Sequence, residues 1–232
     1  MDFSSRMPRS KLLMVMIGFP IVATMISLLL VNRGLIARFG LDFSTTFRVI
    51  VICWYVAQIF WISKLLGRID WSWSRIGFGL SKVRTVYFCL GYLLFALGLM
   101  AFVEYALANG AVDSEKLQAV VGLSPRTTVG RLTFIILGLV AGLAEEMVYR
   151  GYVISGLISR GFKKWQAVLL AALPFFFQHG IKAYQLNWGA WYIAWGVAFG
   201  CMFLWRKNLY LNIVIHWLVI LSAMAAVLQA VK

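Results

Sequence analysis

Five ionisable side chains that could support hydrolytic chemistry lie inside long apolar stretches of this 232-residue sequence. They are Glu145, Glu146, Arg150, His179 and His216, and the two histidines are the only ones in the chain. An ionisable group at membrane depth is costly to bury, so such groups usually mark a functional site. Their concentration in the C-terminal half is the most informative feature of the sequence.

The motif Glu145-Glu146-x-x-x-Arg150 places three charges on one predicted helix. Residues four apart share a helical face, so Glu146 and Arg150 are a predicted ion pair, with the acid in the favourable N-terminal position. Glu145 points about 100° away from Glu146, which allows its carboxylate to face a cavity. A buried carboxylate beside a second one is a candidate for taking up a proton near neutral pH. The alternative is a charge cluster that only packs helices.

Two histidines on separate predicted spans complete a set of groups that can activate water. His179 and His216 can hold a water molecule beside Glu145 or donate a hydrogen bond to a developing oxyanion. One Glu and two His are also the ligands of a hydrolytic zinc site. Two alternatives stay open: the three residues bind one Zn²⁺, or they hold the water with no metal.

The composition indicates that membrane-spanning helices must position these residues. Hydrophobic residues make up 62% of the chain and charged residues 13%, with a mean hydropathy of +0.85. A soluble domain has about half apolar and a quarter charged residues. The net charge of +14 comes from Lys and Arg between apolar runs, where lipid headgroups explain it without a nucleic-acid partner. Cys53, Cys89 and Cys201 lie within apolar runs, and we expect small buried side chains there.

Apolar runs of about 20 residues predict an all-α, polytopic integral membrane protein with seven transmembrane helices. The predicted spans are residues 12–31, 47–66, 85–108, 131–158, 165–185, 188–205 and 209–231. We expect N-terminal transmembrane helices with an amphipathic loop over residues 1–124, and a catalytic membrane core over residues 125–232. More Lys and Arg fall on the side of the N-terminus, which predicts a cytoplasmic N-terminus, and a bacterial plasma membrane is expected. The span 165–185 puts His179 closer to the outer side than Glu145.

The motifs of the C-terminal half occur in the order of a known family of membrane proteases. Three motifs carry the likeness: Glu145-Glu146-x-x-x-Arg150 (EExxxR), Phe175-x-x-x-His179 (FxxxH) and His216. Over roughly residues 125–231 the chain resembles the CAAX-protease and bacteriocin-processing family, also called CPBP, Abi or type II CAAX prenyl endopeptidases. The segment 76–80 resembles the short amphipathic lead-in of many members.

The resemblance implies an intramembrane endopeptidase that acts on a membrane-associated substrate, prenylated or carrying a leader peptide. It makes Glu145 the base that activates water, while Glu146 and Arg150 brace the helix. His179 would share the water or a metal with Glu145, and His216 would stabilise the oxyanion. A metalloprotease is implied by the resemblance only.

One position departs from the family pattern. The last motif usually reads HxxxN, whereas Ile220 stands one turn after His216, and Asn212 lies one turn before it. The alternative function is therefore a non-catalytic membrane protein, an immunity or scaffold partner that keeps the fold and the ion pair. A third hypothesis is a small transporter with a proton relay through Glu145 and His179, but the sequence has no inverted repeat to favour it.

Overall fold

Every regular element in the described part of the chain is a helix, which confirms the predicted all-α fold. The computed structural model describes residues 6–79, 125, 127–181 and 189–230, together with single positions between 87 and 105. In chain order the helices are α1 (Arg9–Leu13), the π-helical η1 (Met14–Gly18), α2 (Phe19–Ser27), the 3-10 turn η2 (Leu28–Leu30), α3 (Gly34–Ala37), α4 (Phe43–Arg68), the 3-10 turn η3 (Trp73–Ile76), α7 (Thr128–Glu145), the π-helical η4 (Glu146–Ile154), α8 (Ser155–Ser159), α9 (Lys164–Gln178), α11 (Gly189–Arg206) and α12 (Leu209–Ala230).

Among the described residues, three continuous helical segments are long and apolar enough to cross a membrane. They are α1 through η2 (Arg9–Leu30), α4, and α7 through α8 (Thr128–Ser159), at the predicted spans 12–31, 47–66 and 131–158. A shorter apolar helix, Leu209–Ser222, lies within α12. The predicted span 85–108 lies mostly outside the described residues.

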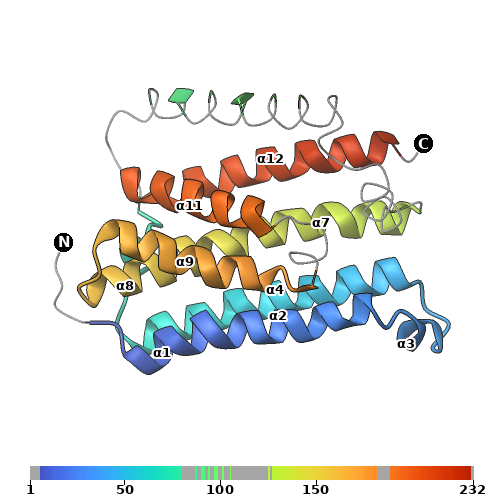
Figure 1. The fold of residues 1–232 in the computed structure, drawn as a ribbon, viewed down its shortest axis with the longest axis horizontal. Helices are drawn as coiled ribbons and strands as arrows, with labels where there is room; N and C mark the ends of the chain where they lie inside the picture. The colour runs from blue at the N-terminus through green and yellow to red at the C-terminus, as the bar shows by residue number, and fades with distance from the viewer. Residues whose placement is uncertain are drawn as a thin grey trace.

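The long helices run along one common direction and form a bundle (Figure 1). The segment α7–η4–α8 lies at its centre, packed against α4, α9 and α12, while α2 and α11 cover α9 from two sides. All nine residues of η4 are buried, including Glu146 and Arg150. The charged motif therefore lies in the most enclosed part of the bundle.

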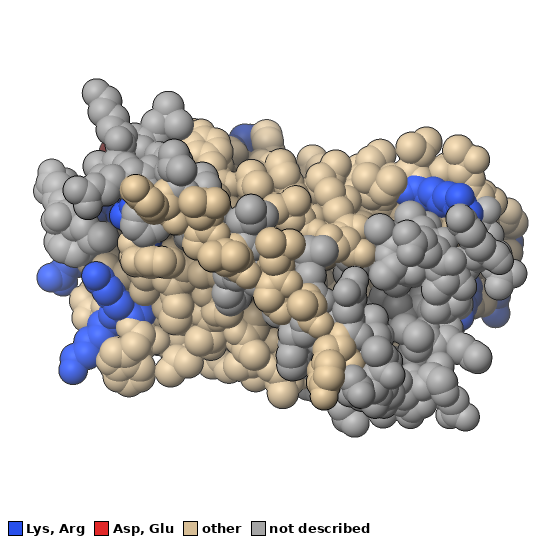
Figure 2. All heavy atoms as spheres, turned by 90° about the horizontal axis from the view of Figure 1, so that it is seen from above, with Lys and Arg blue, Asp and Glu red and all other residues tan. Residues whose placement is uncertain are grey.

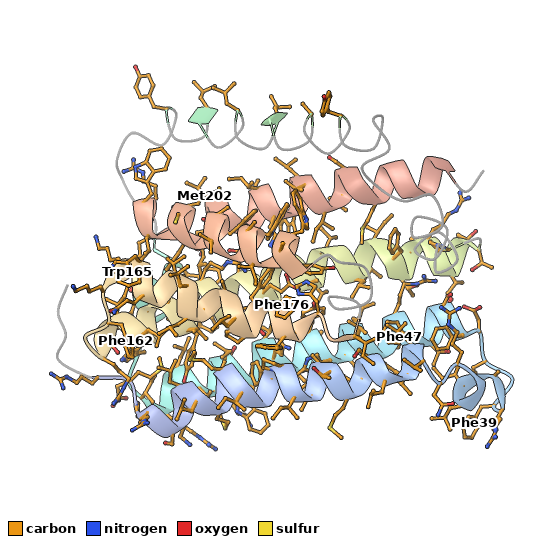
Figure 3. All side chains as sticks on the ribbon, in the orientation of Figure 1. Phe39, Phe47, Phe162, Trp165, Phe176 and Met202 are labelled. Carbon is orange, nitrogen blue, oxygen red and sulfur yellow. The ribbon has the colours of Figure 1, made fainter. Side chains whose placement is uncertain are left out.

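The outer faces of the bundle are apolar over the middle of its length. Ile17, Met25 and Phe60 each expose more than half of their side-chain surface, as expected for helices that face lipid. Most Lys and Arg side chains visible in Figure 2 lie toward the two ends of the long axis. The labelled aromatic residues Phe39 and Phe47 lie near one end and Phe162 and Trp165 near the other (Figure 3). This pattern is that of an integral membrane protein.

The cysteines differ from the prediction. Cys53 on α4 and Cys201 on α11 are exposed, because they lie on the outward, lipid-facing sides of their helices rather than at a helix contact. Cys89 lies outside the described residues.

Local sequence signals fix where α7 and α4 begin. The Thr127 side chain accepts a hydrogen bond from the Gly130 amide at 3.0 Å and caps α7. Asp42 accepts from the Thr45 amide at 2.7 Å and caps α4, and hydrogen bonds from the side chain and the amide of Thr45 lower the pKa of Asp42. Both caps are short polar side chains of the type that favours a helix start.

Glycines on the central segment let α12 approach closely. A Cβ atom on Gly142 would lie 2.7 Å from Cδ1 of Trp217, and one on Gly151 would lie 2.8 Å from Cδ1 of Leu209. Since Trp217 adjoins His216 in the chain, the contact at Gly142 sets the distance between that histidine and the carboxylates.

Candidate active site

Glu145 and Glu146 occupy the junction between α7 and η4, where the helix changes from α to π geometry. Both side chains are buried, and their carboxylates face different neighbours. A π-helical turn within an α-helix occurs frequently at functional sites. The two adjacent acids therefore have different partners except for His216, which both of them approach.

Glu146 is held by side chains from two helices. Its Oε1 atom lies 3.4 Å from Nη1 of Arg150, one turn along η4, and 2.9 Å from Nδ1 of His216 on α12. Its Oε2 atom accepts a hydrogen bond from Nδ2 of Asn212 at 3.0 Å. The predicted i,i+4 pair is confirmed, and the carboxylate has partners on both oxygens.

The buried guanidinium of Arg150 is compensated by rings as well as by Glu146. Its Cζ atom lies 4.3 Å from the centre of the Phe175 ring and 5.5 Å from that of Phe199. Its Nη2 group also lies 3.5 Å from the carbonyl oxygen of Trp195. Aromatic faces stabilise a desolvated cation, so α9 and α11 are both tied to η4 through this one side chain.

The two histidines point their Nε2 atoms at Glu145. Nδ1 of His179 lies 2.8 Å from the carbonyl oxygen of Phe175, and a carbonyl only accepts, so this nitrogen carries a proton. Nε2 of His179 then lies 3.9 Å from Oε1 of Glu145. Nε2 of His216 lies 3.7 Å from Oε2 of the same carboxylate. The structure therefore brings together all three residues predicted to handle water.

His179 reaches this position because α9 ends earlier than predicted. The helix stops at Gln178, seven residues before the end of the predicted span 165–185, and Gly180 follows with φ +58°. That left-handed turn favours glycine and ends the helix in the middle of the bundle. His179 consequently lies at the depth of Glu145, not closer to the outer side.

His179 is also the most accessible of these side chains. Its side chain is 18% exposed, whereas those of Glu145, Glu146 and His216 are at most 4% exposed. The ring of Tyr192 stacks on it, with centroids 3.7 Å apart and planes 24° apart. The ring of Phe175, the other member of the FxxxH motif, contacts it from its own helix.

Asn212 and Ile220, which lie one turn before and one turn after His216, have different roles in the structure. Asn212 donates to Glu146 and to the carbonyl oxygen of Phe199, both at 3.0 Å, so it supports the carboxylate that holds His216. Ile220 packs close to Gly138 on α7. The amide before the histidine thus braces the charged network, while the position after it serves helix packing.

Two polar residues of α4 belong to the cluster and were not predicted as site residues. The Tyr55 hydroxyl donates to Oε1 of Glu145 at 2.6 Å. Gln58, one turn further along, donates to Gln178 at 3.0 Å, and Gln178 also accepts from the Tyr149 hydroxyl. The sequence feature that could have identified them is the spacing of Tyr55 and Gln58, which places two polar groups on one face of an apolar helix.

The donor atoms of Glu145, His179 and His216 are those of a zinc site, but their arrangement is not. Within the described residues, no group of three or more His, Cys, Asp or Glu side chains is placed to hold a metal ion. The side chains as they lie do not fit the zinc alternative.

The fold and the cluster define an integral membrane protein with a buried carboxylate–histidine site. Residues 127–221 match the family described as type II CAAX prenyl endopeptidase Rce1-like, which confirms the predicted resemblance. The matched region runs from the start of α7 into α12 and contains every predicted site residue, but it is less than half of the chain. It indicates CAAX-type endopeptidase activity in general. No curated protein and no solved structure matches the chain.

Proposed function

We propose that the protein is an intramembrane endopeptidase that hydrolyses a peptide bond of a membrane-associated substrate with water activated by Glu145. The observation that carries this proposal is the position of the Glu145 carboxylate between the Nε2 atoms of His179 and His216, at 3.9 and 3.7 Å. These separations are longer than direct hydrogen bonds, and in this proposal one water molecule lies beside the three groups and bonds to each of them.

Glu145 acts as the general base and then as the general acid. Its carboxylate takes a proton from water while the water oxygen attacks the peptide carbonyl carbon. The resulting carboxylic acid gives the proton to the amide nitrogen as the carbon–nitrogen bond breaks. His179, protonated on Nδ1 by its contact with Phe175, offers a lone pair on Nε2 that accepts the second hydrogen of the water and orients it.

His216 stabilises the negative oxygen of the tetrahedral intermediate in this proposal. Because its Nδ1 atom is bound to Glu146, the ring donates to an oxyanion only when Nε2 also carries a proton. The ion pair of Glu146 with Arg150 and the amide of Asn212 hold that carboxylate, and hence the ring, in place. Their role is to position His216 rather than to touch the substrate.

The family match supports a prenylated or leader-bearing peptide as the substrate. Access to the buried base runs past His179, the one partly exposed member of the site. The rings of Phe175 and Tyr192 lie against His179. Such a surface suits a substrate that carries a lipid chain or an apolar segment. The same proposal places the protein in a bacterial plasma membrane with its N-terminus in the cytoplasm. It also divides the chain after residue 124 into N-terminal transmembrane helices and a catalytic membrane core.

The test compares cleavage of a farnesylated CAAX-type peptide in vesicles that contain the wild type or Glu145→Gln at equal protein levels. We expect products from the wild type and none above background from the variant. Asp70→Asn is the matched control, because Asp70 is exposed, lies outside the helices, and has a positive φ that Asn tolerates.

Each outcome of this comparison assigns a role. Identical products from the wild type and Glu145→Gln would overturn the catalytic role, and a scaffold or immunity partner would become the better hypothesis. A chelator arm tests for a metal: activity that is lost on chelation and restored by Zn²⁺ would assign one, and the water would then be bound differently from the arrangement proposed above.

A further inference from the structure

The hydroxyl of Tyr55 makes the closest polar contact that the structure records for Glu145. It lies 2.6 Å from Oε1, whereas the two histidine nitrogens lie more than a further 1 Å away from the carboxylate. An ionised carboxylate only accepts hydrogen bonds, so Tyr55 is the donor. A short O–H···O⁻ bond of this kind is among the stronger hydrogen bonds in proteins.

The Tyr55 ring has little freedom to move away from this contact. It packs in a small cluster with Ala141 and Ala144, which lie one turn and one residue before Glu145 on α7. Tyr55 is buried and Ala144 is fully enclosed. The hydroxyl is therefore held by the same helix contact, α4 against α7, that carries the base.

We propose that Tyr55 is a positioning residue that fixes which oxygen of Glu145 acts as the base. The hydroxyl takes one lone pair of Oε1, which also faces His179, and leaves Oε2, the oxygen that faces His216, as the one with no direct hydrogen bond and hence the base. This inference rests on the proposed function of Glu145. It also makes α4 a part of the active site, although α4 lies outside the region that matches the family.

The test is Tyr55→Phe, which removes the hydroxyl and keeps the ring and its packing. On the farnesylated peptide we expect kcat to fall about 10- to 100-fold, the effect of losing a hydrogen bond to a charged group. We expect KM to stay within about twofold, because the substrate does not touch Tyr55. Thermal unfolding of the two proteins in the same lipid shows that the fold is unchanged.

Tyr152→Phe is the matched control. Tyr152 is fully buried on η4, and its hydroxyl has no hydrogen-bond partner among the described residues. Loss of that hydroxyl should leave kcat and KM unchanged. A Tyr55→Phe variant with wild-type kcat, or one whose loss is matched by Tyr152→Phe, would overturn the proposal.

A second readout does not depend on activity. The chain has only four glutamates, so infrared spectra of protein with ¹³C-labelled Glu resolve few carboxylate bands, and the band lost in Glu145→Gln identifies this residue. We expect Tyr55→Phe to shift that band and Tyr152→Phe to leave it in place. If the wild type does not cleave the peptide, the proposed function fails, and the position of the band alone decides whether Tyr55 holds Glu145. A band that Tyr55→Phe leaves unshifted would refute the contact between Tyr55 and Glu145.

Discussion

Nδ1 of His216 lies 2.9 Å from Oε1 of Glu146, and this contact joins α12 to the π-helical segment η4 at the centre of the bundle. The same oxygen lies 3.4 Å from Nη1 of Arg150. Glu146 is therefore occupied by a cation on its own helix and by an imidazole from another. Glu145, its neighbour in sequence, faces the opposite nitrogen of that imidazole. The two acids thus lie on the two sides of one histidine, and only Glu146 is within hydrogen-bond distance of it, which supports different roles for them.

Removing the Glu146 carboxylate should damage stability as well as activity. In Glu146→Gln the buried Arg150 loses its anionic partner, and breaking a buried pair from one side costs about 3–5 kcal/mol. The free energy of unfolding in detergent, measured by titration with a denaturing detergent, checks this value.

Glu145→Gln is the contrasting variant. Its polar contacts are with Tyr55 and the two histidines, and an amide oxygen still accepts from Tyr55. We expect a much smaller loss of unfolding free energy together with the larger loss of activity. Equal destabilisation by the two variants would contradict the division of roles.

His179→Phe should abolish cleavage with little effect on folding. The ring is partly exposed, and a phenyl ring retains the stacking on Tyr192 while losing both nitrogens. We expect kcat to fall at least about 100-fold, in the range of lost general acid–base or water-orienting groups. The check is single-turnover cleavage beside thermal unfolding of the same samples. Retention of more than a tenth of the wild-type rate would show that His179 does not orient the water.

The charged part of the site could be predicted from the sequence because its residues are rare in apolar helices. Glu145, Glu146, Arg150, His179 and His216 are costly at membrane depth, so their presence alone marks them. The spacing of Glu146 and Arg150 predicts a contact within one helix, and that contact is present. Contacts between site residues on different helices could be predicted only from the order of the three family motifs along the chain.

The hydroxyl and amide groups of the site could not be identified in this way. Tyr and Gln occur in membrane helices for many reasons, so Tyr55 and Gln58 carry no sign of their partners. Their contacts depend on how α4 packs on α7 and α9, which periodicity does not determine. The end of α9 was misplaced for a related reason: hydropathy averages over the turn at Gly180, where backbone geometry ends the helix.

The close approach at Gly142 predicts a sensitive position remote from the reacting atoms. In Gly142→Ala the added Cβ lies within 3 Å of the Trp217 ring, so α12 must shift and carry His216 with it. We expect a loss of about 1–3 kcal/mol of stability, typical of overpacking, and reduced kcat. Gly67→Ala on α4 is the matched control, since nothing lies within 4 Å of its added Cβ. A neutral Gly142→Ala would show that the helices adjust without moving the site.

Asp42 gives a prediction for the dependence of stability on pH. The hydrogen bonds from Thr45 lower the pKa of Asp42 below its ordinary value of 3.8, so its stabilisation is present above that pH and lost as pH falls through the lower, folded value. Asp42→Ala should therefore cost about 1 kcal/mol at neutral pH, a typical value for a lost helix cap, and less at a pH of about 3. Unfolding free energies of wild type and variant at both pH values measure this difference. Asp42→Asn, which caps without a charge, is the control: if its own difference from the wild type shows no change between the two pH values, the Asp42 charge contributes nothing to the stability of α4.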